Sequence, residues 1–438
     1  MEYLSNISFA IVLIVGISFF VMNVRKLIRN IKLGKDVDRS DNKAARWKNM
    51  ARIALGQSKM VSRPIAGFLH IIVYVGFIII NIEVLEIIID GLFGTHRVFQ
   101  PLLGEAFYGF LIGSFEILAL LVFVSVIIFW LRRNIDNIKR FMSKEMKGWP
   151  KSDGNLILYF EMVLMTLFIV MNAADPVFQE AGVGNPVSQF VAPLFSEFTP
   201  ESLHLVEQIA WWLHIVGILI FLNYLYYSKH LHILLAFPNT FYANLNPKGQ
   251  FTNLESVTNE VKMMMDPDAD PYAMPEDGKE DDVPEKFGAS DVTDLNWVQL
   301  LNAYTCTECG RCTSACPANL TGKELSPRAI MMKTRDRLEE VGKNIDGNNG
   351  EFKEDGKQLL NDYITPEELW ACTSCNACVE ECPVNIDPLS IIMDMRRYLV
   401  MEQSAAPQEL NMMMTNIENN GAPWQYSQQD RLNWKDEA

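Results

Sequence analysis

Eight cysteines carry the clearest chemistry in this 438-residue chain, and all of them lie between Cys306 and Cys382. They form two runs with the same spacing. Two-residue gaps separate the first three cysteines, and a three-residue gap precedes a fourth cysteine and a proline. The runs are Cys306, Cys309, Cys312, Cys316 and Pro317, then Cys372, Cys375, Cys378, Cys382 and Pro383. Cysteines clustered in this way are typical of metal ligands in a reducing compartment.

This spacing predicts two [4Fe–4S] clusters. The two-residue gaps let one loop wrap three thiolates around one face of a cluster, while the fourth cysteine follows on a short helix and reaches the other cluster. We therefore expect crossed ligation, with one cluster on Cys306, Cys309, Cys312 and Cys382 and the other on Cys372, Cys375, Cys378 and Cys316. The alternative is zinc, which also binds paired cysteines. A third cysteine at the same spacing and a following proline in both runs are unusual for zinc.

Histidines in the apolar part of the chain are candidate haem ligands, because ionisable residues at membrane depth are costly and usually functional. His70 is expected near the start of the second apolar segment, and His232 at the same depth near the end of the fifth. Two imidazoles at one depth on neighbouring antiparallel helices can ligate one b-type haem iron from opposite sides. We predict this role for His70 and His232, with His230 as the substitute. The alternative is that they are polar interfacial residues.

A second, outer haem is a further hypothesis. His214 shares a face with His232, because 18 residues are five turns at about 100° per residue. No histidine of the second segment lies opposite His214, which leaves Met171 or an open position as its partner.

Acidic residues inside the apolar segments are candidates for proton exchange with a quinone. Glu83 and Glu86 fall in the outer half of the second segment, and His204 lies beside an outer loop. The alternative is that these carboxylates cap helices or form ion pairs near the interface.

Five apolar segments must position these side chains. Each has about the 20 residues with which a helix crosses a bilayer core of about 30 Å. They are residues 7–24, 65–93, 107–131, 155–173 and 207–228. Lysine and arginine gather in 25–63 and 132–151, whereas 174–206 contains neither. Because basic loops stay in the cytoplasm, we expect an outside N-terminus and cytoplasmic cysteines. The alternative, an apolar helix bundle buried in a soluble protein, does not explain the sorted charges.

The predicted fold class is mainly α, with a five-helix transmembrane bundle and an α-helical dicluster ferredoxin-like cytoplasmic domain. We expect a membrane anchor over 1–240, an acidic linker over 241–290, the cluster domain over 291–402 and a polar tail over 403–438. Segments 326–340 and 387–400 are predicted helices, and compact packing is expected to resume near Leu295. The net charge of −15 resides in the cysteine-containing part, which therefore disfavours nucleic acid. We expect no cleavable signal peptide.

The chain resembles two known families. The five-helix part looks like the cytochrome b domain of the nitrate reductase gamma subunit. The stretch around Cys306–Cys312, together with Leu325–Arg328, resembles the iron–sulfur subunits of heterodisulfide reductases and their membrane-bound relatives, as does Tyr227–His232 at the end of the anchor. Members of the gamma-subunit family have two histidines on the second helix, whereas only His70 fits here. Catalytic heterodisulfide reductase chains have CCG repeats, and this chain has none.

These expectations define a membrane electron-transfer subunit. It would connect a quinone pool, haem b and two [4Fe–4S] clusters to a cytoplasmic partner, either a CCG-type iron–sulfur protein or a flavoprotein. The expected location is the cytoplasmic (inner) membrane of a bacterium or archaeon. The alternative function is a redox-sensing or docking anchor that binds clusters without quinone turnover.

Overall fold

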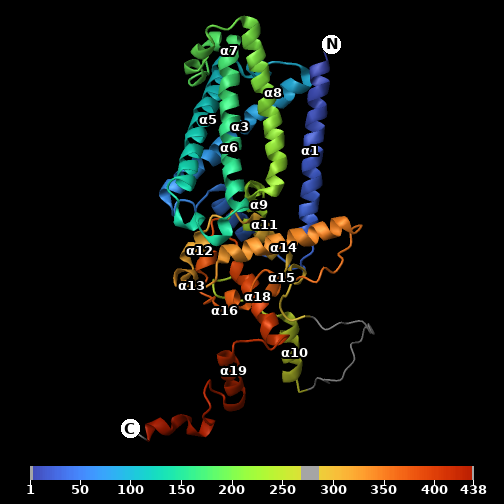
Figure 1. Cartoon of the computed structure of the whole chain (residues 1–438), viewed down its shortest axis with the longest axis vertical. Coiled ribbons are helices and arrows are strands. Elements are labelled where there is room, and N and C mark those ends of the chain that lie inside the picture. The colour runs from blue at the N-terminus through green and yellow to red at the C-terminus, as the bar shows by residue number, and fades with distance from the viewer. Residues whose placement is uncertain (1–2, 268–285, 437–438) are drawn as a thin grey trace.

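The computed structural model describes residues 3–267 and 286–436, and within these ranges the chain is helical without a β-strand (Figure 1). Part of the expected acidic linker, including Glu280–Asp282, lies outside the described residues. Long helices stand side by side at one end of the molecule, and the cysteine-containing part lies beneath them. The mainly α architecture is therefore confirmed.

Five helices of the bundle are long and apolar enough to cross a membrane. They are α1 (Leu4–Ile31), α3 (Pro64–Phe93), α5 (Glu105–Asn134), α6 (Trp149–Ala174) and α8 (Pro200–Tyr224). The five predicted segments are confirmed as helices. Large apolar side chains such as Ile14, Phe68 and Phe110 are exposed on their outer faces. A bundle buried in a soluble protein would hide these side chains from water, so that alternative is not supported.

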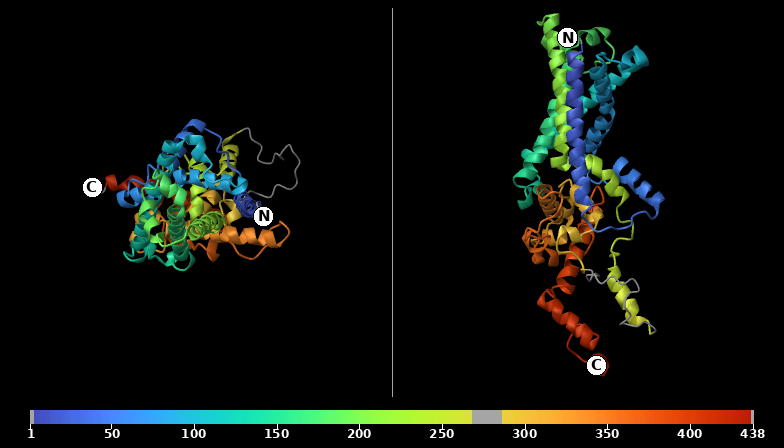
Figure 2. Two further views of the ribbon diagram at one scale, coloured as in Figure 1. Left: turned by 90° about the horizontal axis from the view of Figure 1, so that it is seen from above. Right: turned by 90° about the vertical axis from the view of Figure 1, so that its right-hand side faces the viewer.

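Short helices connect the long ones at both ends of the bundle. The N-terminal end carries α4 (Phe99–Leu103), α7 (Pro176–Ala181), η4 (Ser188–Phe190) and η5 (Ala192–Phe195). The other end carries α2 (Lys43–Met50), the π-helical turn η1 (Ala51–Leu55), η2 (Lys139–Phe141) and η3 (Lys144–Met146). The N-terminus and the cysteine-containing part lie at opposite ends of the bundle, as Figure 2 shows from the side. An odd number of spans produces this arrangement.

The fifth long helix is not continuous to His232. After η6 (Leu225–Tyr227) the backbone is extended at Ser228, and the chain resumes as η7 (Lys229–Leu231) and α9 (His232–Phe241). The carboxylate of Asp153 holds this break open, because it accepts hydrogen bonds from Ser228 Oγ at 2.6 Å and from Lys229 N at 3.1 Å. The expectation that His214 and His232 share one helix face is therefore wrong, because the helix is interrupted between them. His232 nevertheless lies at the end of the bundle that faces the cysteine-containing part.

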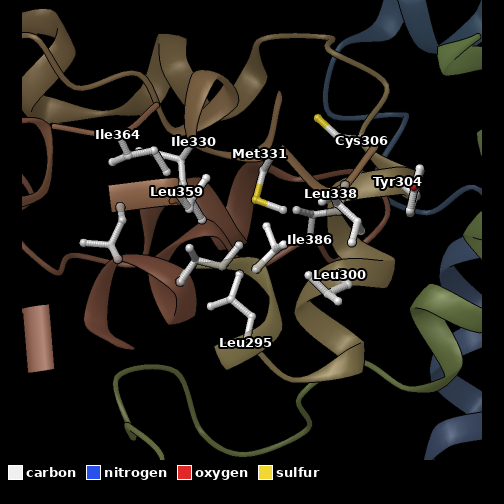
Figure 3. Packing of buried hydrophobic residues seen from close by; sticks show 14 of the residues in the cluster. Leu295, Leu300, Tyr304, Cys306, Ile330, Met331, Leu338, Leu359, Ile364 and Ile386 are labelled. Carbon is white, nitrogen blue, oxygen red and sulfur yellow. The ribbon is translucent and has the colours of Figure 1, made fainter. Parts of the chain in front are cut away.

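The cysteine-containing part is built from helices around a hydrophobic core, in which Leu300, Ile330 and Leu359 are fully buried (Figure 3). This core is continuous with buried bundle residues such as Leu27 and Leu225. Its helices are η8 (Val292–Asp294), α11 (Trp297–Thr305), α12 (Arg311–Ala315), α13 (Pro317–Leu320), α14 (Pro327–Gly347), α15 (Leu359–Asp362), α16 (Pro366–Trp370), α17 (Ala377–Glu381) and α18 (Pro388–Met401). The predicted helices over 326–340 and 387–400 are α14 and α18. Both begin with a proline behind a capping side chain, Ser326 or Asp387.

The packed region begins earlier than expected, because Ala289 and Val292 are already buried ahead of Leu295. Three helices extend away from it: α10 (Glu255–Met265), α19 (Gln408–Asn420) and η9 (Gln428–Lys435). The last two lie in the expected polar tail, where no helix is predicted from the sequence (Figure 1).

The first long helix docks directly on the cysteine-containing part. Lys35 N donates to Leu295 O at 2.8 Å, and Trp297 N donates to Lys35 O at 3.0 Å. Asn30 Nδ2 donates to the hydroxyl of Tyr304 at 2.9 Å inside the same interface. Gly34 permits this approach, because a Cβ there would lie 2.7 Å from Trp297 N and 2.8 Å from Leu295 O. These are backbone atoms, which cannot move aside as a flexible side chain can.

Gly34→Ala is therefore expected to push the anchor and the cysteine-containing part apart. Overpacking of this kind typically costs about 1–3 kcal/mol, so the melting temperature of the detergent-solubilised protein should fall. The matched control is Gly347→Ala, because a Cβ at Gly347 has no neighbour within 4 Å among the described residues. Equal melting temperatures for the two variants would contradict the proposed close approach.

Candidate functional site

The two cysteine loops have the same backbone conformation. The residue before the second cysteine is left-handed in both, with φ of 53° at Glu308 and 55° at Ser374. The residue after that cysteine is left-handed as well, with φ of 71° at Gly310 and 60° at Asn376. Glycine and asparagine adopt this conformation more easily than other residues. Each loop then enters a short helix, α12 or α17, so the repeated spacing corresponds to a repeated structure.

The two loops face each other, and their cysteines meet across the interface between α12 and α17. Cys306, Cys309 and Cys312 line one small cavity together with Cys378 and Cys382 of the other run. Cys316 lies near Cys372 and Cys378. The two runs therefore meet, and the division of the eight cysteines into crossed sets stays a prediction. We name them the first cluster site (Cys306, Cys309, Cys312 and Cys382) and the second cluster site (Cys372, Cys375, Cys378 and Cys316).

The donor set fits an iron–sulfur cluster. Burial raises the pKa of Cys306 to about 12 and that of Cys382 to about 11, so these thiols need a positively charged partner to become thiolates. Backbone N–H groups already point at the sulfurs. Ser374 N donates to Cys372 Sγ at 3.4 Å, and Ile386 N donates to Cys382 Sγ at 3.2 Å. Such contacts stabilise anionic sulfur.

A second cavity, of about 380 Å³, lies between the bundle and the first cluster site, and we call it the histidine cavity. His70 on α3 lines it together with His230 and His232 from the break after α8. The ring centres of His70 and His232 are 6.4 Å apart, and those of His230 and His232 are 5.4 Å apart. Burial lowers the pKa of His230 and His232, which leaves both imidazoles neutral and able to ligate a metal.

Basic side chains line another wall of the histidine cavity, and sequence reasoning did not single them out as site residues. They are Arg132, Arg133 and Arg140. The guanidinium groups of Arg133 and Arg140 lie 5.1 and 5.0 Å from the ring centre of Phe141. The buried Nε atoms of these two arginines have no hydrogen-bond partner among the described residues, and neither has Nδ1 of His70. The cavity therefore presents unpaired donors to whatever occupies it.

The histidine cavity extends to the cysteines. Thr307, Glu308 and Cys309 of the first loop line it together with Pro383, which follows Cys382. A cofactor in this cavity would therefore contact the first cluster site, and the second cluster site would lie behind it.

A buried ion pair joins the histidine-bearing loop to the first cysteine loop. The carboxylate of Glu308 contacts Lys229 Nζ, and it accepts a hydrogen bond from Arg335 of α14 at 2.9 Å. Lys229 Nζ also donates to Pro150 O at 2.7 Å. Burial pushes the pKa of Glu308 upward, but Lys229 and Arg335 hold it below its ordinary value. Neither Lys229 nor Glu308 belongs to the cysteine or histidine pattern, so sequence reasoning missed both.

The end of the bundle that carries the N-terminus holds a polar network, which contains only part of the predicted quinone site. Glu86 accepts hydrogen bonds from Tyr108 Oη at 2.9 Å and Phe99 N at 2.8 Å. Tyr108 in turn accepts one from Arg97, which donates to Asp175 at 2.9 Å.

The other predicted residues of this region lie in different surroundings. Glu83 Oε2 is buried without a hydrogen-bond partner among the described residues. His204 is exposed, and its Nδ1 lies 3.1 Å from Glu207 Oε2. His214 is buried, and its ring centre lies 6.1 Å from that of Phe168. Met171 is buried in the hydrophobic cluster that also contains Phe168. His214 does not line the histidine cavity, so its role as a ligand stays a prediction.

The fold and the cysteine site together define an iron–sulfur electron-transfer protein with apolar helices that can span a membrane. A family model described as a 4Fe–4S dicluster domain matches residues 305–386. This match supports iron–sulfur clusters over the zinc alternative. No solved structure matches the chain.

Curated relatives agree with this class. The chain is 29% identical to a probable iron-sulfur-binding oxidoreductase, FadF, of Bacillus subtilis and 23% identical to an EtfAB:quinone oxidoreductase of Syntrophomonas wolfei. Both matches cover 98% of this chain but only 60% and 59% of the relatives, so the chain spans about three fifths of their length. Over 35% of the chain and 25% of the relative, it is 32% identical to a probable membrane-anchored ferredoxin of Chromohalobacter salexigens.

Glu308→Gln tests the buried ion pair. Removal of the carboxylate leaves Lys229 and Arg335 without their buried counter-charge, which typically costs about 3–5 kcal/mol. We expect a lower melting temperature and fewer non-haem irons per chain. The difference in stability between Glu308→Gln and the unmodified protein is fully present at pH values above the ordinary glutamate pKa of 4.5. It disappears as the pH falls through the lowered pKa of Glu308.

The control for this variant is Glu340→Gln, because Glu340 forms an exposed ion pair with Lys357. Exposed pairs contribute little to stability. If the two variants melted at the same temperature, Glu308 would not hold the two loops together.

Proposed function

We propose that this chain is a membrane electron-transfer subunit that connects a quinone pool, one haem b and two [4Fe–4S] clusters to a cytoplasmic redox partner. The observation that carries the proposal is the histidine cavity, which brings an imidazole pair and the first cysteine loop to one enclosed space. The match to iron–sulfur oxidoreductases supports the class.

The spacing of the histidines favours a haem. If each metal–nitrogen bond is about 2 Å, two imidazoles on opposite sides of one iron have ring centres about 6 Å apart. The rings of His70 and His232 are 6.4 Å apart. His230, 5.4 Å from His232, is the substitute ligand. Because His230 and His232 come from one loop, His70 on α3 and His232 on α9 are the residues that would hold the haem iron.

The arginines distinguish between the two redox molecules that suit an apolar cavity with imidazoles. A b-type haem carries two carboxylates, whereas a quinone carries no anionic group. The buried Nε atoms of Arg133 and Arg140 have no hydrogen-bond partner among the described residues, although Nη2 of Arg133 donates to Pro150 O and Lys151 O. Guanidinium groups bind carboxylates, so Arg133 and Arg140 are the residues that would hold the carboxylates of a haem. When bound, a haem supplies one-electron redox chemistry.

The residues of this chain bind, orient and enclose the cofactors. Asp153 fixes the break at Ser228 that aims His230 and His232 into the cavity. Glu308 and Lys229 keep that loop against the first cluster site. The short distance between cofactors is the property that permits electron transfer, and the packing of α9 and α11 against one another maintains it.

We propose that proton exchange with quinone takes place at the end of the bundle that lies far from the cysteines. Glu83, Glu86 and His204 are the proposed residues, and Glu86 is supported by its place in the network with Tyr108 and Arg97. We also propose a second haem at His214 in this part of the bundle, with Met171 or an open position as its partner.

The basic loops support a cytoplasmic location for the cluster domain in a bacterial or archaeal inner membrane, because lysine and arginine gather at its end of the bundle. The proposed partner is a CCG-type iron–sulfur protein or a flavoprotein. Relatives longer than this chain, one of them named as an EtfAB:quinone oxidoreductase, support such an additional redox unit. The alternative function is a redox-sensing or docking anchor, which predicts cluster binding without quinol oxidation.

His70→Ala is expected to abolish the low-spin haem signal in the dithionite-reduced minus air-oxidised spectrum of the purified protein, because His70 supplies one axial ligand. The iron of the clusters should remain at about eight non-haem irons per chain. His96→Ala, at the opposite end of the bundle, is the control and should keep the haem signal. An unchanged spectrum in His70→Ala would rule out this ligand.

Glu86→Gln separates the proposed function from the docking alternative. We expect reduction of the clusters by a quinol to slow about 10²–10⁴-fold, the usual contribution of a positioned proton-transfer group, while reduction by dithionite is unaffected. Glu105→Gln, at the exposed start of α5, serves as the control. If quinol fails to reduce the clusters of the unmodified protein, the docking function is the correct one.

A further inference from the structure

The membrane anchor places a lysine directly on the first cluster site. Lys59 lies between η1 and α3, and its Nζ donates to Cys382 O at 3.2 Å and to Glu380 O at 3.1 Å. Arg311, beside Cys312, donates to Lys59 O at 2.8 Å and so fixes the same segment from the other side. The segment that carries Lys59 is therefore part of the surroundings of this cluster.

Acidic side chains close to the first cluster site are paired with cations. Glu380 forms an ion pair with Lys248, and Glu381 lies 3.6 Å from Arg63. Because both carboxylates are paired with other cations, neither of them forms an ion pair with Lys59. Arg140 adds a further positive charge near Cys309.

Lys229 and Arg335 neutralise Glu308 in the first cysteine loop, and the same two cations also pair with Asp153 and Asp336. This group of charges therefore adds no excess positive charge.

The positive charge at the first cluster site comes instead from Lys59 and Arg140, which belong to the loops of the membrane anchor, and from Arg311.

The second cluster site has a different environment. Arg396 donates to Cys372 O at 2.5 Å, but the half-buried carboxyl of Asp387 lies near Cys378 and opposes it. Two cysteines of each site are buried, but Cys375 of the second site is exposed, whereas Cys309 and Cys312 of the first site are only partly so. The second site is thus the one that an external redox partner can approach.

We propose that Lys59 raises the reduction potential of the first cluster site above that of the second, so that electrons enter at the second site beside exposed Cys375 and pass through the first site into the membrane. The direction of electron transfer rests on the proposed function, whereas the order of the two reduction potentials rests on the surroundings of the two cluster sites alone. Reduction adds one electron and no proton to a site that is already anionic. A nearby cation therefore stabilises the reduced state.

The proposed sequence is one of single-electron steps without bond making. The cytoplasmic partner, a reduced flavoprotein or iron–sulfur protein, is oxidised by one electron at a time. The quinone receives two electrons through the histidine cavity together with two protons. The reaction that supplies this chain is therefore an oxidation of a cytoplasmic substrate, and the chain delivers its electrons to the membrane.

The test is a potentiometric titration of the full chain in detergent, followed by electron paramagnetic resonance of the reduced clusters. The unmodified protein should show two one-electron steps. Lys59→Gln should lower the equilibrium constant for the higher-potential step by about tenfold, equivalent to about 59 mV for one electron, and leave the lower step in place. Arg396→Gln should lower only the lower-potential step.

Lys43→Gln is the matched control, because Lys43 is an exposed lysine of the same cytoplasmic region, and it should move neither step. Lys59→Arg keeps the charge and should keep the higher potential, which separates an electrostatic effect from a loss of folding. A single midpoint for both clusters, or a shift of the lower step in Lys59→Gln, would overturn the proposal. The titration requires neither quinone nor haem. A failed quinol assay would therefore overturn the proposed function, but it would not decide which cluster has the higher reduction potential.

Discussion

The contact between Lys229 and Glu308 is the constraint on which the rest of the site depends. Lys229 belongs to the break that aims two histidines into the bundle, and Glu308 belongs to the loop that presents Cys306 and Cys309. A buried carboxylate with two cationic partners is stable only when all three groups are in place. Together with the docking of Lys35 on Leu295 and Trp297, this interaction sets the distance between the membrane part and the cysteines, and with it the separation of any cofactors that they hold.

Much of the fold could be predicted from the sequence, because its signals are local. An apolar run of the length of a bilayer specifies a helix, and a proline after a capping side chain specifies where α14 and α18 begin. The cysteine spacing is also local, and the repeated left-handed residues at Glu308 and Ser374 show why the two runs form matching loops.

The parts that could not be predicted depend on contacts between distant segments. The break at Ser228 is held by Asp153, which lies 75 residues earlier in the sequence, and a helical wheel drawn through His214 and His232 does not include that carboxylate. Arg133 and Arg140 look like topogenic charges in the sequence, and only packing against Phe141 places them in the wall of a cavity. The exposure of His204 agrees with its expected place in or beside a loop.

The histidine cavity is walled by two regions of the chain that are synthesised at different times. Its helices α3, α5 and α6 precede the cysteine loops, and Thr307, Glu308, Cys309 and Pro383 complete its wall on the side of the cysteines. The bundle alone therefore forms this cavity with one wall missing. Folding of the cysteine loops against the bundle is the step that completes the cavity, so its final shape depends on the part of the chain that is synthesised last.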